Sequence, residues 1–332
     1  MYHNPYMNLQ GGRWIKTNFH THAGTGEGTC GSYPIDFVLQ LYRELGYGAV
    51  CLSNHDLCTD AASIDGGGLF VIQGVEYSRD EHMLTVGVNR ALHELPHQEA
   101  IDEAISQNGF VIPCHPNWIR KEYWPRPKLD ALSGYTGIEV INMLIYRLSG
   151  SGLATDTWDY ILKQGRLIYG FGSDDFHRPY DAGRGYTDIY VLCDDGIDSG
   201  ASFGDGAGSG GGTDSGSGAG FGGGASNAGG VSFAALKRAV DCGRFTASTG
   251  LSLEYFTLTD GVLNIKASYP RETYINEFNY RFISENGLEA ESFGETAEFK
   301  IKGEKYIRVE ACAENGALLF TQPVYEKEFF NM

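Results

Sequence analysis

Histidines and carboxylates recur in this chain around the ends of short apolar runs. His20 and His22 stand two residues apart after one such run, and Asp175 and His177 repeat this spacing much later. Side chains at positions i and i+2 of a strand lie on one face, so both members of a pair can point into the same cavity. Further histidines and glutamates lie between these two pairs, several of them at or after the ends of other apolar runs: Glu27, His55, Glu76, His82 and His115. Imidazole and carboxylate ligands without cysteine suit Zn²⁺, Mn²⁺ or Fe²⁺, so the set predicts a metal site.

A structural explanation competes with metal binding at each position taken alone. A single histidine at the end of a strand is usually a hydrogen-bonded structural residue, and one His-x-His or Asp-x-His pair would be weak evidence. Here, however, six of the nine histidines occur within or just after apolar strands, each beside other residue types that bind metals. Neutral histidines and carboxylates packed together without a metal would leave buried charge uncompensated. The pattern therefore favours a metal centre over a structural cluster.

The elements that must hold these residues alternate between strand and helix from Trp14 to Gly250. Apolar runs typical of buried strands occupy residues 15–22, 48–54, 69–76, 83–89, 110–114, 137–142, 166–172 and 189–193. Helical patterns occupy residues 34–46, 98–108, 155–164 and 232–242. This alternation indicates a parallel sheet covered by helices, with the candidate ligands at its carboxyl edge, where α/β folds build active sites. We expect closure into a barrel, with an open doubly wound sheet as the alternative.

The chain divides into three parts by composition. Residues 1–195 and 231–250 carry the strand and helix pattern, whereas residues 196–230 are mostly Gly, Ser, Ala and Asp and predict a flexible surface insertion. A glycine-rich phosphate cradle is the alternative for this stretch, but the motifs typical of one are missing. Residues 251–332 contain turn dipeptides between β-rich runs and predict a small antiparallel β domain of sandwich type.

Overall charge and cysteine content narrow the possible partners and compartment. The formal net charge of −17 predicts that the chain binds no nucleic acid, although a small anionic substrate remains compatible with it if metals supply local positive charge. Seven scattered cysteines indicate reduced thiols. Because no apolar run is long enough for a membrane helix and no secretion signal is seen, we expect a cytoplasmic protein without a membrane partner. The sequence does not indicate the oligomeric state.

The order of the motifs resembles the PHP (polymerase and histidinol phosphatase) family over residues 13–250. The opening motif is His20-Thr21-His22 followed by Glu27-Gly28, where most relatives have Asp in place of Glu27. Five further motifs follow in the family's order: Ser53-Asn54-His55-Asp56, Gly74-Val75-Glu76 with His82 beyond it, Cys114-His115-Pro116-Asn117, Gly137-Ile138-Glu139-Val140 and Gly172-Ser173-Asp174-Asp175-Phe176-His177. The stretch from Gly243 to Gly250 resembles the tail of PHP phosphoesterases.

This resemblance implies a distorted (β/α)7 barrel of PHP type, followed here by the small antiparallel β domain, with two or three divalent ions at the barrel rim. By the same resemblance, three sets of ligands are implied: His20, His22, Glu76 and Asp175 for the first ion, Glu27, His55 and His177 for the second, and Glu76, His82 and His115 for a third. Asp174 could replace Asp175, but only Asp175 shares a strand face with His177. Asp56 is expected to orient a histidine.

We expect a metal-dependent phosphoesterase that acts on a small phosphorylated substrate. Metal-bound hydroxide would attack phosphorus, and His82 or Asp175 would assist the leaving group. Arg178 follows a ligand directly and is the preferred phosphate clamp, with Arg147 next. Glu139 either points into the barrel, where it supports a ligand or contacts the substrate, or is buried and paired for structural reasons. The alternatives are hydrolysis of a carboxylic ester, amide or lactone, and a degenerate barrel that serves as a binding module.

Overall fold

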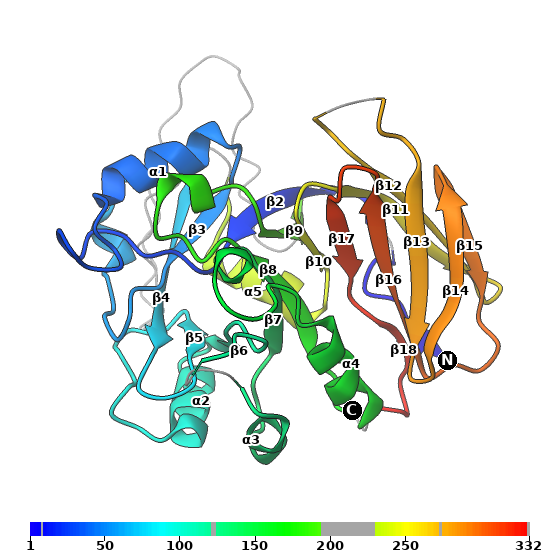
Figure 1. The fold of residues 1–332 in the computed structure, drawn as a ribbon, viewed down its shortest axis with the longest axis horizontal. Coiled ribbons are helices and arrows are strands. Elements are labelled where there is room, and N and C mark those ends of the chain that lie inside the picture. The colour runs from blue at the N-terminus through cyan, green and yellow to red at the C-terminus, as the bar shows by residue number, and fades with distance from the viewer. Residues whose placement is uncertain (8, 121–123, 194–229, 272–273, 331–332) are drawn as a thin grey trace, which may run out of the picture.

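The computed structural model describes residues 1–7, 9–120, 124–193, 230–271 and 274–330. Its helices lie among the strands that end at Phe245–Ser248, and the chain beyond them is built of strands and loops (Figure 1). The helices are α1 (Ile35–Glu44), α2 (His97–Ser106), α3 (Arg126–Ala131), α4 (Thr155–Lys163) and α5 (Phe233–Asp241), with 3-10 turns η1 (Ala61–Ser63), η2 (Ile145–Arg147) and η3 (Pro179–Asp181). Four of the five α-helices match a predicted helix, and α3 was not foreseen. The mixed α/β class is confirmed.

The strands of the α/β part are β2 (Gly12–Asn18), β3 (Ala49–Leu52), β4 (Phe70–Tyr77), β5 (Met83–Val86), β6 (Phe110–Pro113), β7 (Gly137–Asn142), β8 (Tyr169–Ser173), β9 (Tyr186–Leu192) and β10 (Phe245–Ser248). A large sheet has the order β10-β9-β2-β3-β4-β5-β6 in this part. Within this part of the large sheet, β2, β3 and β4 pair in parallel. β5 and β9 run antiparallel to both of their neighbours. The sheet is therefore mixed rather than all-parallel.

The predicted closed barrel is not found among the described strands. β7 and β8 form a parallel pair of their own beside the large sheet. β9 explains why β8 does not join the sheet, because β9 already pairs with β2 on one edge and with β10 on the other. Gly172 of β8 instead exchanges hydrogen bonds with the side-chain hydroxyl of Thr187 on β9, at 3.1 and 3.0 Å.

Amphipathic helices cover this framework, as the sequence periodicity predicted. Val38, Leu39 and Tyr42 of α1 are buried against Val50 and Leu52 of β3. α5 buries four apolar residues in a cluster with β9 and β10: Ala235, Leu236, Ala239 and Val240. Such apolar burial contributes roughly 25 cal/mol per Å² and fixes the strands whose ends carry the candidate ligands. No helix within the described ranges is long and apolar enough to cross a membrane.

The remaining strands are β1 (Tyr2–His3), β11 (Ser252–Thr259), β12 (Val262–Ser268), β13 (Phe278–Ser284), β14 (Gly287–Gly294), β15 (Thr296–Lys300), β16 (Tyr306–Ala313), β17 (Leu318–Thr321) and β18 (Val324–Glu326). Their pairings are antiparallel. Asp260-Gly261, Asn286-Gly287 and Asn315-Gly316 lie at the turns of three hairpins, as expected. β17 also pairs with β10, so one sheet runs through both parts. Nearly all of the predicted insertion, residues 196–229, lies outside the described residues.

One buried carboxyl in the central ladder predicts a pH effect on stability. Asp188 of β9 lies opposite Lys16 of β2, and burial, opposed by Lys16, raises the pKa of Asp188 to about 7. The folded protein then binds this proton more tightly than the unfolded chain, so stability falls as pH rises from about 4 through 7. In urea unfolding at pH 5 and 7.5, Asp188→Asn should lose less stability with rising pH than the unsubstituted protein. Equal losses in both proteins would contradict the prediction.

Candidate metal centre

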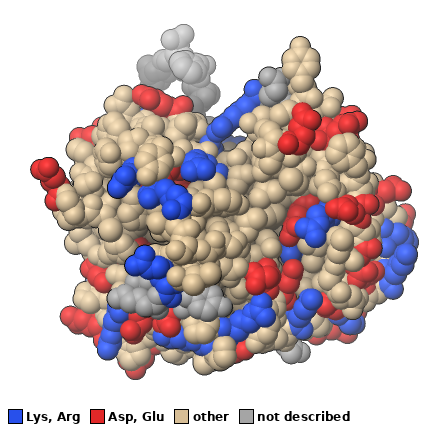
Figure 2. All heavy atoms as spheres, viewed as in Figure 1, with Lys and Arg blue, Asp and Glu red and all other residues tan. Residues whose placement is uncertain are grey.

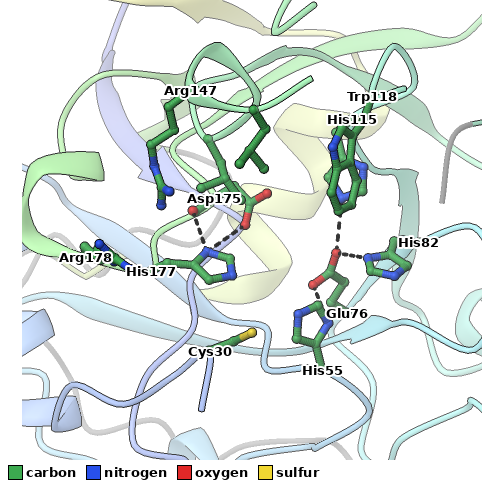
Figure 3. Close-up of a pocket in the computed structure, with 12 residues that line it drawn as sticks. Cys30, His55, Glu76, His82, His115, Trp118, Arg147, Asp175, His177 and Arg178 are labelled. Carbon is green, nitrogen blue, oxygen red and sulfur yellow. Dashed lines mark hydrogen bonds and ion pairs between the residues drawn. The ribbon is translucent and has the colours of Figure 1, made fainter. Parts of the chain in front are cut away.

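Two pairs of neighbouring chain segments bring the candidate ligands to one place. Thr21, between His20 and His22, pairs in parallel with Phe176, between Asp175 and His177. His55 likewise pairs with Glu76, which belongs to β4. β2, β3 and β8 all end at this edge, so the residues after them face a common cavity. Figure 3 shows His55, Glu76, His82, His115, Asp175 and His177 on the cavity wall.

The tightest group is formed by donor atoms of His20, His22, Glu76 and Asp175. Nε2 of His20 lies 3.2 Å from both Glu76 Oε2 and Asp175 Oδ1, and Nε2 of His22 lies 3.3 and 3.4 Å from the same oxygens. All four side chains are buried, yet none of these four atoms has a hydrogen-bond partner among the described residues. Donors about 2.0–2.1 Å from a tetrahedral ion lie about 3.3 Å from one another. The spacing of His20, His22 and Asp175 therefore fits one metal ion, and Glu76 approaches both imidazoles at a similar distance.

Glu76 connects this group to three further histidines. Its Oε2 lies 2.8 Å from Nδ1 of His55, and its Oε1 lies 2.9 Å from Nδ1 of His82 and 3.4 Å from Nε2 of His115. The Glu76 side chain is only 1% exposed, so neither oxygen is well solvated. A carboxylate between two sets of imidazoles can bridge two ions. Glu76 thus lies between the residues that the resemblance assigned to the first and third ions.

A second group lies on the other side of His22. Ring nitrogens of His22, His55 and His177 come within 4.8 Å of one another. Cys30 lies on the wall of the same cavity as His55 and His177, although the residue as a whole is exposed (Figure 3). The two histidines beside it, opposed by partial burial, lower the pKa of the Cys30 thiol to about 5. Glu27 is exposed in the loop before it and does not line the cavity.

Electrostatics also favour a bound cation. Burial opposes ionisation of Glu76 and Asp175, but the surrounding histidines hold the pKa of both carboxyls well below the usual value. Burial likewise opposes protonation of His20, yet Asp175, Glu76 and Glu139 raise the pKa of His20 well above its usual value. Ionised carboxylates buried at this density require positive charge, from protons on the imidazoles or from metal ions. The His, Glu and Asp clusters can hold metal ions.

Glu139 supports the first group from behind rather than facing a substrate. Its Oε1 lies 2.8 Å from Nδ1 of His20 and accepts the Ser173 hydroxyl. Its Oε2 accepts the amide of His115 at 2.7 Å and the side-chain amide of Asn142 at 2.8 Å. With four partners and 1% exposure, Glu139 has no oxygen left for a substrate. Of the roles left open by the sequence, the geometry favours orienting His20, and the substrate-binding assignment is withdrawn.

Asp174 and Asp175, adjacent in sequence, have different surroundings. Asp174 faces away from the cluster and accepts the backbone amides of residues 183–185 and the hydroxyls of Tyr42 and Tyr47. Asp175 adopts φ 52°, which turns its carboxylate into the cluster. Asp56 and His115 also have positive φ, at 49° and 32°. Side chains rarely adopt this conformation without strain, and such residues concentrate at functional sites.

Two arginines lie at the mouth of the cavity, and the sequence did not reveal the residue that positions one of them. Arg147 and Arg178 both line the cavity (Figure 3). Asp181, buried on η3, binds Nε and Nη2 of Arg147 at 3.1 and 3.2 Å. It also accepts the backbone amides of His177 and Arg178. Arg178 is exposed, and no ion pair to its guanidinium is seen in the described part of the chain. Arg147 is thus held in place, while Arg178 can reach a ligand.

Comparisons with known proteins give only distant likeness. No family model and no curated protein matches the sequence. The structure is similar to the lesion-specific endonuclease PfuEndoQ from Pyrococcus furiosus, with 14% identity, a TM-score of 0.39, and coverage of 54% of this chain and 53% of that chain. It is also similar to PsfC from Pseudomonas syringae PB-5123, with 14% identity, a TM-score of 0.37, and coverage of 53% of this chain and 82% of that chain. This chain thus spans about half the length of the endonuclease.

One sequence-based expectation is corrected at this point. A small phosphorylated substrate and no nucleic-acid binding were expected from the net charge, whereas one structure with this likeness is a lesion-specific endonuclease. Net charge was a poor guide because it averages over the whole surface. On the face drawn in Figure 2, Lys and Arg side chains lie among Asp and Glu side chains, so the formal charge of −17 does not describe every part of the surface. We therefore no longer restrict the substrate to small molecules.

Proposed function

We propose that this chain is a metal-dependent hydrolase of phosphoric esters that holds two or three divalent ions. The observation that carries the proposal is the convergence of four buried atoms that have no hydrogen-bond partner among the described residues, beside a cavity with two arginines at its mouth. Each of the two imidazole nitrogens lies 3.2–3.4 Å from both carboxylate oxygens. When bound, divalent ions lower the pKa of a coordinated water and neutralise charge on a phosphoryl group. Imidazole and carboxylate donors suit Zn²⁺, Mn²⁺ and Fe²⁺.

The chain's own residues would bind and orient the ester. Arg178 and Arg147 would hold phosphoryl oxygens through planar pairs of N–H donors, which lysine cannot reproduce. Of the two candidates for protonating the leaving group, His82 lines the cavity with 11% of its side chain exposed. Asp175 is unsuited to that role because the histidines around it hold its pKa well below the usual value, although burial opposes this. We therefore assign Asp175 to metal binding and His82 to the proton transfer.

Hydrolysis of a carboxylic ester, amide or lactone is the second candidate. The residues that bind the metal ions would be the same for both reactions. The reactions differ in whether the substrate needs a positively charged side chain beside it. A neutral ester needs no guanidinium at the cavity mouth, whereas a phosphate ester gains from each one. The guanidinium of Arg178 has no ion pair in the described chain. This favours a phosphate ester over a neutral ester as the substrate.

Replacing Arg178 tests the proposal. We expect Arg178→Ala to lower kcat/KM for a phosphate ester, with metal content unchanged. The lost transition-state stabilisation should be about 1.5–3 kcal/mol, the contribution of a hydrogen bond to a charged group. The assay should use Mn²⁺- and Zn²⁺-loaded protein with phosphomonoesters, cyclic nucleotides, damaged and intact nucleic acid, and a neutral carboxylic ester. Arg90→Ala is a matched control, because Arg90 pairs with Glu103 outside the cavity lining. Faster hydrolysis of the neutral ester, unaffected by Arg178→Ala, would favour the second candidate.

A further inference from the structure

The cavity wall carries apolar side chains as well as metal ligands and arginines. Three apolar residues of this lining have no part in the proposed function: Trp118, Leu144 and Leu148. Figure 3 shows Trp118 beside His115, whereas Arg147 and Arg178 lie on the opposite side of the cavity. The indole ring of Trp118 lies 5.0 Å from the imidazole of His115, centroid to centroid, edge to face. An ester whose phosphoryl group is held by the arginines can thus place its alcohol part against Trp118.

Backbone pairing fixes the position of Trp118. Trp118 forms an antiparallel bridge with Gly150, and Ile119 donates its amide to the Ser149 carbonyl at 3.0 Å. Gly150 adopts φ 117°, and a Cβ there would lie 2.3 Å from the carbonyl oxygen of Asn117, so only glycine permits this approach. The indole Nε1 is buried and has no hydrogen-bond partner in the described chain. The position of Trp118 therefore comes from backbone pairing and not from a hydrogen bond of its own side chain.

One short turn joins the other two apolar residues to Arg147. The amide of Arg147 donates to the Leu144 carbonyl at 3.1 Å, which closes η2. Leu148 follows Arg147 directly and lies close to the segment of Trp118, because the next residue, Ser149, accepts a backbone hydrogen bond from that segment. Leu144 is buried, whereas Leu148 is 38% exposed. The turn that presents the guanidinium therefore also presents an apolar surface that continues to Trp118.

We propose that Trp118, with Leu144 and Leu148, binds the alcohol part of the phosphate ester, and that this alcohol carries an aromatic ring. The inference rests on the proposed function and adds the chemical class of the substrate. Leucine side chains accept any apolar group, whereas an indole also favours a second aromatic ring in offset or edge-to-face contact. The guanidinium carbon of Arg120, an exposed residue, lies 5.5 Å from the centroid of the Trp118 ring. Such contacts are weak at exposed sites, so a ring of the substrate can replace this one.

Three phosphate monoesters that differ only in the alcohol test this inference: 3-phenylpropyl, 3-cyclohexylpropyl and propyl phosphate. All three alcohols are primary, so the esters differ in the group that contacts the cavity wall and hardly in the acidity of the alcohol. We expect kcat/KM for the phenylpropyl ester to exceed that for the propyl ester about tenfold, and that for the cyclohexylpropyl ester about threefold. Trp118→Leu should abolish the preference for phenyl over cyclohexyl and leave metal content and hydrolysis of propyl phosphate nearly unchanged. Trp118→Phe should retain the preference.

A matched control and a binding measurement accompany the kinetics. Trp14→Leu is the control, because Trp14 is a partly exposed tryptophan that packs on Tyr190 outside the cavity lining. It should keep the preference for the phenylpropyl ester. Calorimetry with 3-phenylpropylphosphonate and propylphosphonate, which are not hydrolysed, gives a second readout. The phenylpropyl compound should bind about tenfold more tightly to the metal-loaded protein, and this difference should shrink in Trp118→Leu.

The outcomes separate this inference from the function on which it rests. Equal values of kcat/KM for the three esters, or a preference that survives Trp118→Leu, would overturn the role of Trp118. A cyclohexylpropyl ester hydrolysed as well as the phenylpropyl ester would overturn the aromatic class of the substrate. In each of these cases hydrolysis of phosphate esters continues, so the proposed function stands. No hydrolysis of any phosphate ester by metal-loaded protein would overturn the proposed function instead.

Discussion

Replacing His20 and His22 together by alanine should remove at least one divalent ion per chain and lower phosphoester turnover by about a thousandfold or more. Both rings are buried and both present a nitrogen to the same two oxygens, of Glu76 and Asp175. Without them those carboxylates retain only part of a coordination shell. Loss of several kcal/mol of charge stabilisation corresponds to this decrease in rate, at about 1.4 kcal/mol per factor of ten.

The measurement is elemental analysis combined with kcat/KM on the preferred ester. His93→Ala provides the control, because His93 is a partly exposed histidine whose Nδ1 lies 4.0 Å from Asp56 and which does not line the cavity. It should keep both ions and full turnover. Less than half an equivalent of any transition metal in the unsubstituted protein, grown with metal supplementation, would contradict the metal centre itself. Full metal content in the double variant would contradict the ligand assignment.

The arrangement of the main ligands could be predicted because it depends on local periodicity. His20 and His22 flank Thr21, and Asp175 and His177 flank Phe176, as their spacing predicted, although Asp175 turns into the cluster through its positive φ of 52° rather than through a shared strand face. Parallel pairing of their segments then places both pairs together. The place of Cys30 on the cavity wall could not be predicted in this way. Its position depends on a turn at 26–29 and on the close approach of Gly31 to Asn54, and neither leaves a periodic signal.

Strand direction was the other feature that the sequence did not reveal. An apolar run is equally consistent with a parallel or an antiparallel neighbour when both of its faces are buried. β5 and β9 are such runs, and both are antiparallel to the strands beside them. The turn dipeptides of the C-terminal part did specify direction, because a two-residue hairpin joins only antiparallel strands. Prediction succeeded where the turn chemistry was explicit.

The largest effect on stability is expected at Arg308, which joins the C-terminal strands to α4. Arg308 is fully buried on β16, and its Nε and Nη2 bind the two oxygens of Asp159 at 2.7 and 2.8 Å. Its Nη1 binds Glu310 at 2.7 Å, and the guanidinium lies 4.9 Å over the ring of Trp158. Asp159 and Trp158 belong to α4. The side chain thus bridges the two parts that composition divides at residue 250.

Removing one partner of a buried ion pair leaves the other charge uncompensated, so Arg308→Ala should lower the free energy of unfolding by about 3–5 kcal/mol. Arg281→Ala is a matched control, since Arg281 also binds Glu310, at 3.0 Å, but is 43% exposed. Its loss should be at most about 1 kcal/mol. Urea unfolding followed by both near- and far-ultraviolet circular dichroism measures the two values. A single shifted transition is expected, because the sheet is continuous from β10 to β17. A loss similar to that of Arg281→Ala, or a second transition moving alone, would indicate that residues 251–332 fold independently of α4.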